Sequence, residues 1–407
     1  MKAAIYAGKE QIELKELPIP EVGEHDVLIQ NIYSSVCGTD TAVFFGGPGT
    51  GHKVTVGGEF GHETISRVVK TGCLVTDFAV GERVYPYPLY AKNDPFRAGT
   101  LGGFSEYILV PQARRNVGLY PVDDRIPDRL ASLIEPFTVG CRAARRGMIP
   151  AGEGRYLPGQ SAVVFGCGTI GIAAAAAFSY FGMARVMLCD FSNFRLNLAK
   201  NLGFAVCNPA REDFRARALE YFGSAPSLAG PTANIDCWLD AAGTPSILED
   251  FLRLGKIESR FVSVGVNNAP RTIDLLHMTY SQQSIIGSGG YMPQDVWDVQ
   301  RIMTCGRWNM ESIITHEFPL EQLETAIRTA ADVEHAGNVV IRMLPEPRLF
   351  CSPTKSSPAA QPGSFFLFYI VPLYRMALPM PISCRQRGGR PSSPQYSSSA
   401  AIRSSSI

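Results

Sequence analysis

Cys37, His62 and two glutamates are the residues of this chain whose types suit metal chemistry. Cys37 lies in SSVCGTD together with Thr39, His62 and Glu63 lie in GHET, and Glu135 lies further along in LIEPFTVG. A catalytic zinc takes about three protein ligands of such mixed types and keeps one position open, whereas a structural zinc is closed by four. These residues alone leave the metal unsettled, because a lone cysteine or histidine is often a buried structural residue.

The segment SAVVFGCGTIGIAAAA is typical of a dinucleotide-binding turn. Gly166, Gly168 and Gly171 have the G-x-G-x-x-G spacing, after an apolar strand and at the start of an alanine-rich helix. The first glycine permits a tight turn, the second lets the backbone approach a pyrophosphate, and the third allows close helix packing. The helix N-terminus, with Thr169 and Ile170, offers unpaired N–H groups to the phosphates. A turn that binds nothing is the alternative interpretation.

The next apolar strand, RVMLCD, indicates which dinucleotide binds. It ends in Asp190, where an acidic residue accepts a hydrogen bond from the adenosine ribose 2′-hydroxyl and repels a 2′-phosphate. Asp190 therefore favours NAD over NADP. Arg195, five residues later, keeps NADP open, because a guanidinium can cover either a ribose or a phosphate.

The elements that must position these residues predict two domains. From Met1 to about Arg145, short β-rich runs such as DVLIQNIYSSV and TISRVVKTG are punctuated by Gly and Pro, and the N-terminal segment alternates as an edge strand does. From Ser161, apolar strand-length runs alternate with helix-length stretches, which predicts a buried parallel α/β sheet of the doubly wound type. We expect domains at 1–145 and 146–287, with 288–344 completing the first.

Residues 345–407 are rich in Ser, Pro and Arg, a composition that predicts a disordered, low-complexity tail. Within this tail, SFFLFYIVPLYRMALPMPI is apolar enough to suggest a membrane anchor. Three prolines and Arg375 interrupt it over a length that barely spans a bilayer. We therefore expect no membrane association, and interpret the tail as an extension without function.

Composition narrows the partners of the chain. A formal net charge of +1, from 38 basic and 37 acidic residues, predicts no nucleic-acid partner and favours a small-molecule substrate. The N-terminus lacks the unbroken apolar stretch of a signal peptide, and the ten cysteines form no Cys-x-x-Cys pair. We expect a cytoplasmic protein with reduced thiols.

In combination these motifs resemble the zinc-containing medium-chain alcohol dehydrogenase family. The resemblance covers residues 1–344 in the family's order, and the motifs that carry it are CGTD, GHE with the later GERV, GGFSEY, EP, GCGTIG, VGV, GSGGY and VVIR. The glutamate of EP, which stands in place of a cysteine, is most similar to the polyol branch with sorbitol and threonine dehydrogenases. The resemblance implies a GroES-like irregular β-barrel catalytic domain, a Rossmann domain, and a homodimer or homotetramer.

The resemblance also implies a reaction. Cys37, His62 and one of Glu63 or Glu135 would hold a single catalytic zinc. If Glu135 is that ligand, Glu63 would influence the zinc without binding it directly. A secondary alcohol or polyol would bind as a zinc alkoxide and give hydride to NAD, with Thr39 accepting the alcohol proton. The nicotinamide would be held by two further segments of the chain, whose predicted contact residues are Val264, Val266, Gly287 and Ser288.

Four departures limit what can be transferred from the family. PLYAKNDPFRAGTLGGF contains no cysteine, so the lobe for a structural zinc should be absent. Ala42 stands where a proton-relaying histidine is common, and Ser66 where a glycine is usual. Gly290 precedes Tyr291 where polyol enzymes tend to have arginine. Two alternatives stay open: a zinc-free enone or quinone reductase, and an inactive nucleotide-binding sensor or structural protein.

Overall fold

The computed structural model describes residues 1–343 except 52, 93–97, 153–154 and 268. The predicted disordered tail and its apolar run lie outside the described residues. Among the helices that the structure describes, none combines the length and the apolar character needed to cross a bilayer.

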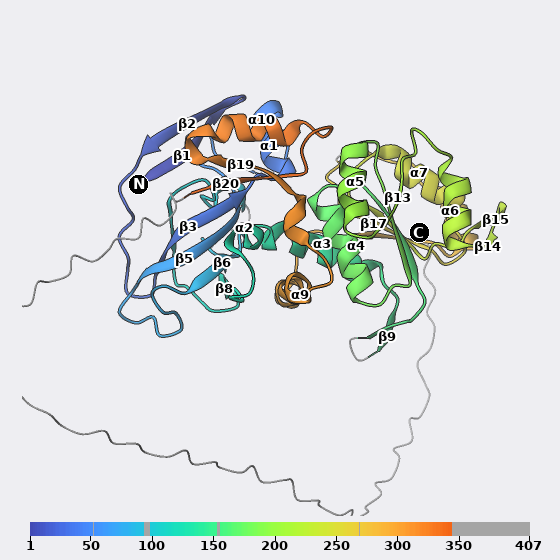
Figure 1. The fold of residues 1–407 in the computed structure, drawn as a ribbon, viewed down its shortest axis with the longest axis horizontal. Helices are drawn as coiled ribbons and strands as arrows, with labels where there is room; N and C mark the ends of the chain where they lie inside the picture. Colours follow the sequence, from blue (N-terminus) through green and yellow to red (C-terminus); the bar gives the residue numbers. More distant parts are fainter. Residues whose placement is uncertain (52, 93–97, 153–154, 268, 344–407) are drawn as a thin grey trace, which may run out of the picture. The chain divides into compact units, whose positions relative to one another are not determined.

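The first part of the structure contains two sheets. The larger one combines strands from both ends of the described sequence, whereas the smaller one contains N-terminal strands. The seven-stranded sheet has the order β19-β20-β3-β5-β6-β8, with β7 paired to β3, and a three-stranded sheet has the order β2-β1-β4. The bounds are β1 (Lys2–Gly8), β2 (Gln11–Glu16), β3 (Val27–Ser35), β4 (Gly58–Glu59), β5 (Glu63–Thr71), β6 (Arg83–Pro86), β7 (Tyr107–Val110), β8 (Leu119–Pro121), β19 (Ile314–Pro319) and β20 (Asn338–Arg342). In Figure 1 the orange segment that contains β20 and α10 lies among the blue N-terminal strands, because β20 pairs antiparallel with β3.

One expectation for this part is wrong. The N-terminal strand β1 is the middle strand of its sheet, not an edge strand, and Ala3 to Tyr6 are all buried. An edge strand with alternating residues would have one side facing solvent. In the structure, β2 and β4 pair with the two edges of β1. Ala4 and Tyr6 of β1 belong to a core cluster that also contains Phe60 and Phe104. The exposed edge belongs to β2, where most residues face solvent.

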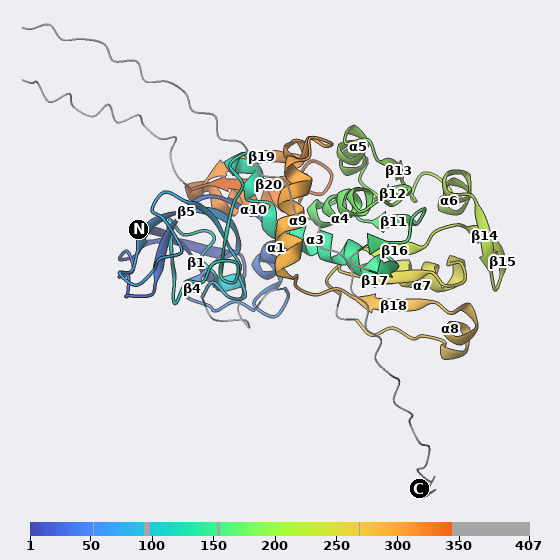
Figure 2. The same cartoon turned by 90° about the horizontal axis from the view of Figure 1, so that it is seen from below.

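Helices that connect or cover these sheets come from several regions of the chain. They are α1 (Gly38–Gly46), η1 (Ala98–Thr100), α2 (Asp128–Ala131), α3 (Ile134–Gly147), α9 (Pro293–Thr304), η2 (Met310–Ile313), η3 (Leu320–Gln322) and α10 (Leu323–Ala331). Figure 2 shows α9 beside α3, where Arg145 donates to the Asp295 carboxylate over 2.8 Å.

The second part is a parallel six-stranded Rossmann sheet with the order β13-β12-β11-β16-β17-β18. The bounds are β11 (Ser161–Phe165), β12 (Arg185–Cys189), β13 (Ala205–Cys207), β16 (Cys237–Asp240), β17 (Arg260–Ser263) and β18 (Ser284–Gly287), with helices α4 (Thr169–Tyr180), α5 (Asn193–Asn201), α6 (Phe214–Phe222), α7 (Pro245–Leu254) and α8 (Leu275–Ser281). Two small hairpins join β9 (Pro150–Gly152) to β10 (Arg155–Tyr156) and β14 (Ser224–Ser227) to β15 (Gly230–Ala233).

The predicted α/β class is confirmed, and the packing explains why its strands are apolar throughout. Val164 and Leu188 pack on one face of the sheet in the cluster that includes α3, α4 and α5, whereas Val163 and Met187 pack on the other face with α6 and α7. Both faces are covered, so all residues of the central strands β11 and β16 are buried. The proposed domain boundaries stay predictions, although the sheets separate in the expected order.

Helix α3 joins the two parts into one apolar core. Its residues Phe137 and Cys141 share a cluster with Ile65 of β5 and with Val164 of β11. Close approach of α3 to α4 depends on Gly140, where an added Cβ would lie 2.6 Å from the carbonyl oxygen of Ile170. The first part, with its mixed β-sheets, and the second part, with its parallel sheet, therefore both pack on α3.

We predict that Gly140→Ala lowers the free energy of unfolding by about 1–3 kcal/mol, because the added methyl group forces α3 away from α4. The direction of this change is informative, because a Gly→Ala substitution within a helix otherwise raises the free energy of unfolding by up to about 1 kcal/mol. Chemical denaturation measures it. Gly49→Ala is the control, because an added Cβ there meets nothing within 4 Å. Equal stability of the two variants would contradict the close packing.

Candidate metal centre and cofactor site

Cys37 caps the N-terminus of α1, directly after β3. Its backbone N–H donates to Asp40 Oδ2 over 3.0 Å, which is the reciprocal half of a capping box. The Thr39 hydroxyl donates to Cys37 Sγ over 3.1 Å. The short helix that CGTD begins thus holds the sulfur and the threonine hydroxyl side by side.

His62 and Glu63 reach the same place through the pairing of β5 with β3. Glu63 begins β5 and lies opposite Ser35 in the antiparallel register. Ser35 in turn precedes Cys37 by two residues in the chain. One ligand atom from each of Cys37, His62 and Glu63 can be chosen so that all three lie within 4.8 Å of one another. Among the described residues, this is the group of cysteine, histidine and acidic side chains whose geometry suits a metal ion.

Asp40 orients two members of this group. Its second oxygen, Oδ1, lies 3.4 Å from His62 Nδ1, while Oδ2 accepts from the Cys37 backbone. A carboxylate on one ring nitrogen of a histidine fixes the ring and leaves the other nitrogen for a metal. Asp40 is the last residue of the CGTD motif. Its position three residues after Cys37 is the signal that could have identified it.

The electrostatics of the group fit a divalent cation. Burial raises the pKa of the Cys37 thiol to about 12, and the nearby Glu63 carboxylate adds to this rise. Burial also raises the pKa of Glu63, whose Oε2 has no hydrogen-bond partner among the described residues. A buried acidic oxygen without a donor is costly. A cation beside the sulfur, the imidazole and this oxygen would favour the deprotonated ligands, and thiolate, imidazole and carboxylate are the donors that zinc takes.

Glu135 lies outside the group of Cys37, His62 and Glu63, but it lines one cavity together with them. It is in the first turn of α3, and burial raises its pKa to about 8. Tyr291 lines the same cavity as Glu135. Tyr291 also hydrogen-bonds to the Tyr85 hydroxyl, and its ring stacks on Tyr87 with centroids 4.4 Å apart. Glu135 thus shares the cavity with a cluster of tyrosines.

The metal-centre cavity has a volume of about 560 Å³. It brings together nine of the predicted site residues, which are Cys37, Thr39, His62, Glu63, Glu135, Ile170, Val264, Val266 and Ser288. Gly287, also predicted, ends β18 and does not line it. The sequence interpretation missed Lys53, Tyr87 and Leu89, because no spacing rule connects them with the motifs.

The glycine-rich turn has the geometry of a dinucleotide site. Gly166 has φ +99°, a conformation that favours glycine, and an added Cβ on Gly171 would lie 1.8 Å from the Gly166 carbonyl oxygen. An added Cβ on Gly168 would meet only Arg195, at 3.8 Å, so the backbone there faces open space. This space is a cavity of about 180 Å³ that Thr169 also lines.

Asp190 and Arg195 line different cavities. Asp190 accepts hydrogen bonds from the backbone of Cys167 over 2.7 Å and of Ser192 over 2.9 Å, and lines a hollow of about 120 Å³ beyond the end of β12. Arg195 lines the cavity at Gly168, and its Nε donates to the Ala336 carbonyl over 3.1 Å. The acidic and the basic side chain would therefore contact different portions of a dinucleotide.

Asn338 connects the two sites. Its Nδ2 donates to Ser35 Oγ over 2.9 Å and to Thr169 Oγ1 over 3.1 Å. Ser35 in turn lies opposite Glu63 in the register of β3 with β5. Asn338 thus contacts both the glycine-rich turn and the strand beside the metal group, and sequence interpretation did not foresee it.

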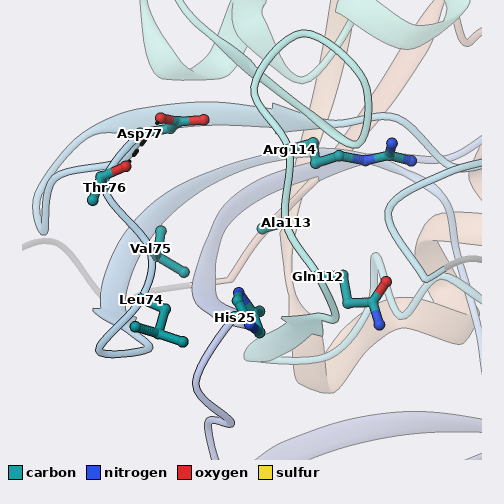
Figure 3. Close-up of a pocket in the computed structure, with 8 residues that line it drawn as sticks. All are labelled: His25, Leu74, Val75, Thr76, Asp77, Gln112, Ala113 and Arg114. Atoms are coloured by element: carbon teal, nitrogen blue, oxygen red, sulfur yellow. Dashed lines mark hydrogen bonds between the residues drawn. The ribbon is translucent and has the colours of Figure 1, made fainter.

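Another hollow, of about 470 Å³, lies between the loop after β5 and the segment after β7 (Figure 3). Its ionisable side chains are His25, Asp77 and Arg114. Figure 3 shows Asp77 and Arg114 at opposite ends of the hollow, with the guanidinium directed away from Asp77. Because these groups do not converge, the metal-centre cavity is the better candidate for chemistry.

Comparison with known proteins agrees with this geometry. A model of the alcohol dehydrogenase GroES-like domain matches residues 23–123, and a model of the zinc-binding dehydrogenase domain matches residues 169–304. An L-threonine 3-dehydrogenase of Anaeromyxobacter dehalogenans is 28% identical over 345 residues, which cover 80% of this chain and 94% of the relative. Another, of Bacillus velezensis, is 28% identical over 329 residues, covering 76% and 90%.

Solved structures share the fold. The 2R,3R-butanediol dehydrogenase of Bacillus subtilis superposes with a TM-score of 0.71 at 23% identity, over 84% of this chain and 99% of the other. Galactitol-1-phosphate dehydrogenase of Escherichia coli superposes with a TM-score of 0.69 at 22% identity, over 84% and 100%.

Fold, metal group and dinucleotide turn together define a two-domain, metal-dependent dehydrogenase. The chain belongs to the zinc-containing medium-chain alcohol dehydrogenase family. It is an oxidoreductase that acts on the CH–OH group of an alcohol or polyol and uses zinc and NAD or NADP. No observation favours the zinc-free reductase or the inactive sensor.

We predict that Asp40→Asn lowers zinc affinity by about 10–100-fold, because the amide cannot hold His62 as a carboxylate does. Competition with a chromophoric chelator measures this affinity. The control is Asp124→Asn, whose side chain is fully exposed. Unchanged zinc affinity in Asp40→Asn would show that the Asp40 contact has no part in metal binding.

Proposed function

We propose that this chain oxidises a secondary alcohol or polyol with NAD, using a zinc ion held by Cys37, His62 and Glu63. One observation carries the proposal. Cys37, Glu63 and Ile170 line both the metal-centre cavity and the cavity at the glycine-rich turn. A cofactor on the turn and a substrate at the metal would therefore meet, as hydride transfer requires.

Zinc, when bound, lowers the pKa of the substrate alcohol, and the nicotinamide accepts the hydride. The chain's own residues position the reactants and move the proton. The Thr39 hydroxyl, which lies in the cavity 3.1 Å from Cys37 Sγ, accepts the alcohol proton. The proton then leaves through water rather than through Ala42, whose side chain has no titratable group. Val264 and Ser288 line the side of the cavity that we assign to the nicotinamide.

NAD is the proposed cofactor, because an acid at the end of the second strand repels a 2′-phosphate, and Asp190 holds that place in the chain. Asp190 keeps its carboxylate at the end of β12, the position from which an acid binds the ribose diol. Arg195 lies at Gly168, on the pyrophosphate side. A cytoplasmic location and a homodimeric or homotetrameric assembly stay predictions.

The zinc-loaded enzyme should reduce NAD with at least one member of a panel of secondary alcohols, polyols and L-threonine. L-Threonine belongs in the panel because the curated relatives named above are threonine 3-dehydrogenases. Cys37→Ser should lose zinc and lower kcat/KM at least about a hundredfold, since the soft ligand is lost. Absorbance at 340 nm and metal analysis measure both. A zinc-free protein with full activity would overturn the proposal.

Matched glutamine variants separate the two candidate carboxylate ligands. Glu63→Gln should lower zinc affinity by more than about tenfold, whereas Glu135→Gln should bind zinc as the unmodified enzyme does, because Glu135 lies outside the ligand group. Each variant replaces a carboxyl group with an amide at nearly constant volume, so each serves as control for the other. The opposite pattern would make Glu135 the ligand.

A further inference from the structure

Lys53 gives the metal-centre cavity its one basic side chain that is not a candidate metal ligand. Among the described residues that line this cavity, Lys53 is the only lysine or arginine. Several other lining residues are aromatic or apolar, among them Tyr87, Leu89 and Tyr291. A small substrate in this cavity would thus meet the metal, apolar side chains and one ammonium group.

The loop after α1 fixes where this ammonium group can reach. The Thr50 hydroxyl donates to the Ala42 carbonyl over 2.6 Å and to the Gly47 carbonyl over 2.8 Å. Gly51 packs so tightly on α1 that an added Cβ would lie 2.8 Å from the Thr39 carbonyl oxygen. Lys53 follows two residues later. The backbone before Lys53 is therefore anchored on the helix that carries Thr39.

Lys53 has no charge partner in the part of the chain that the structure describes. It is exposed and forms no ion pair with any described residue, whereas Lys92 and Lys256 pair with Glu59 and Asp236. A solvated lysine on an outer surface needs no partner. A lysine at the rim of a reaction cavity, however, adds an unbalanced positive charge where the substrate binds.

We propose that Lys53 binds an anionic group of the substrate, so that the enzyme prefers alcohols that carry a carboxylate or a phosphate. This inference rests on the proposed alcohol dehydrogenase function. An ammonium group is a compact charge with three donors on a flexible stem, and it binds either anion without a fixed geometry. Lys53 and Thr39 line the same cavity, and its aromatic and apolar lining residues accommodate the carbon chain.

Substrate pairs that differ in charge test the proposal on the zinc-loaded enzyme with NAD. One pair is 3-hydroxybutanoate and its neutral methyl ester, and another is sorbitol 6-phosphate and sorbitol. The unmodified enzyme should have the higher kcat/KM for the anionic member of at least one pair. The pair that responds distinguishes a carboxylate from a phosphate substrate.

Lys53→Gln should raise KM for that anion about tenfold, the loss expected for one charged hydrogen bond, and leave the neutral partner unchanged. Lys53→Arg should retain most of the preference. Lys70→Gln is the matched control, because Lys70 is an exposed lysine on β5 that does not line the cavity. Added salt should raise KM for the anion only.

Two kinetic outcomes would overturn the proposal: Lys53→Gln leaves the anion preference intact, or it lowers kcat equally for neutral and anionic substrates. The second outcome would assign Lys53 to proton transfer or to loop structure. Calorimetric binding of 3-hydroxybutanoate and sorbitol 6-phosphate to the zinc- and NADH-loaded protein gives a readout that does not need turnover. Binding of neither anion, or equal binding to Lys53→Gln and the unmodified protein, would also overturn it. Lys53-dependent binding without NAD reduction would instead contradict only the proposed function.

Discussion

The structure depends on the cost of burying ionisable ligands together. Cys37 and Glu63 both carry pKa values raised by burial, and one Glu63 oxygen has no donor among the described residues. In a low-dielectric cavity such groups stay protonated or take up a cation. The surrounding elements restrain the ligands against moving apart: the capping box of α1 holds Cys37, and the register of β3 with β5 holds Glu63.

The metal group and the glycine-rich turn are built on shared elements. Helix α3 carries Glu135 at its first turn and packs through Gly140 against the helix of the glycine-rich turn. Asn338 donates to both Thr169 and Ser35, so one amide contacts the cofactor turn and the strand beside Glu63. A change at the dinucleotide turn can therefore reach the strand that pairs with Glu63 through the Asn338 side chain.

The loop between α1 and β4 lies against the helix that carries Thr39. With alanine at position 42, the carbonyl of that residue accepts from Thr50, and the loop lies against α1. The same loop brings Lys53 to the cavity. The region where a relay histidine is common thus supplies a charge for substrate recognition, in our proposal, instead of a route for the proton.

Sequence alone determined the features that local chemistry encodes. Apolar strands alternating with helices predicted the parallel sheet, since residues buried on both faces must be apolar throughout. The G-x-G-x-x-G spacing identified the cofactor turn, because Gly166 and Gly171 meet constraints within one turn of chain. Only the tertiary structure decided what depends on strands meeting at a distance. The register of β3 with β5 brings Glu63 rather than Glu135 into the ligand group, and the folding of separate loops brings Lys53, Tyr87 and Asn338 to the cavities. No local pattern encodes such contacts, because they arise from packing between residues far apart in the chain.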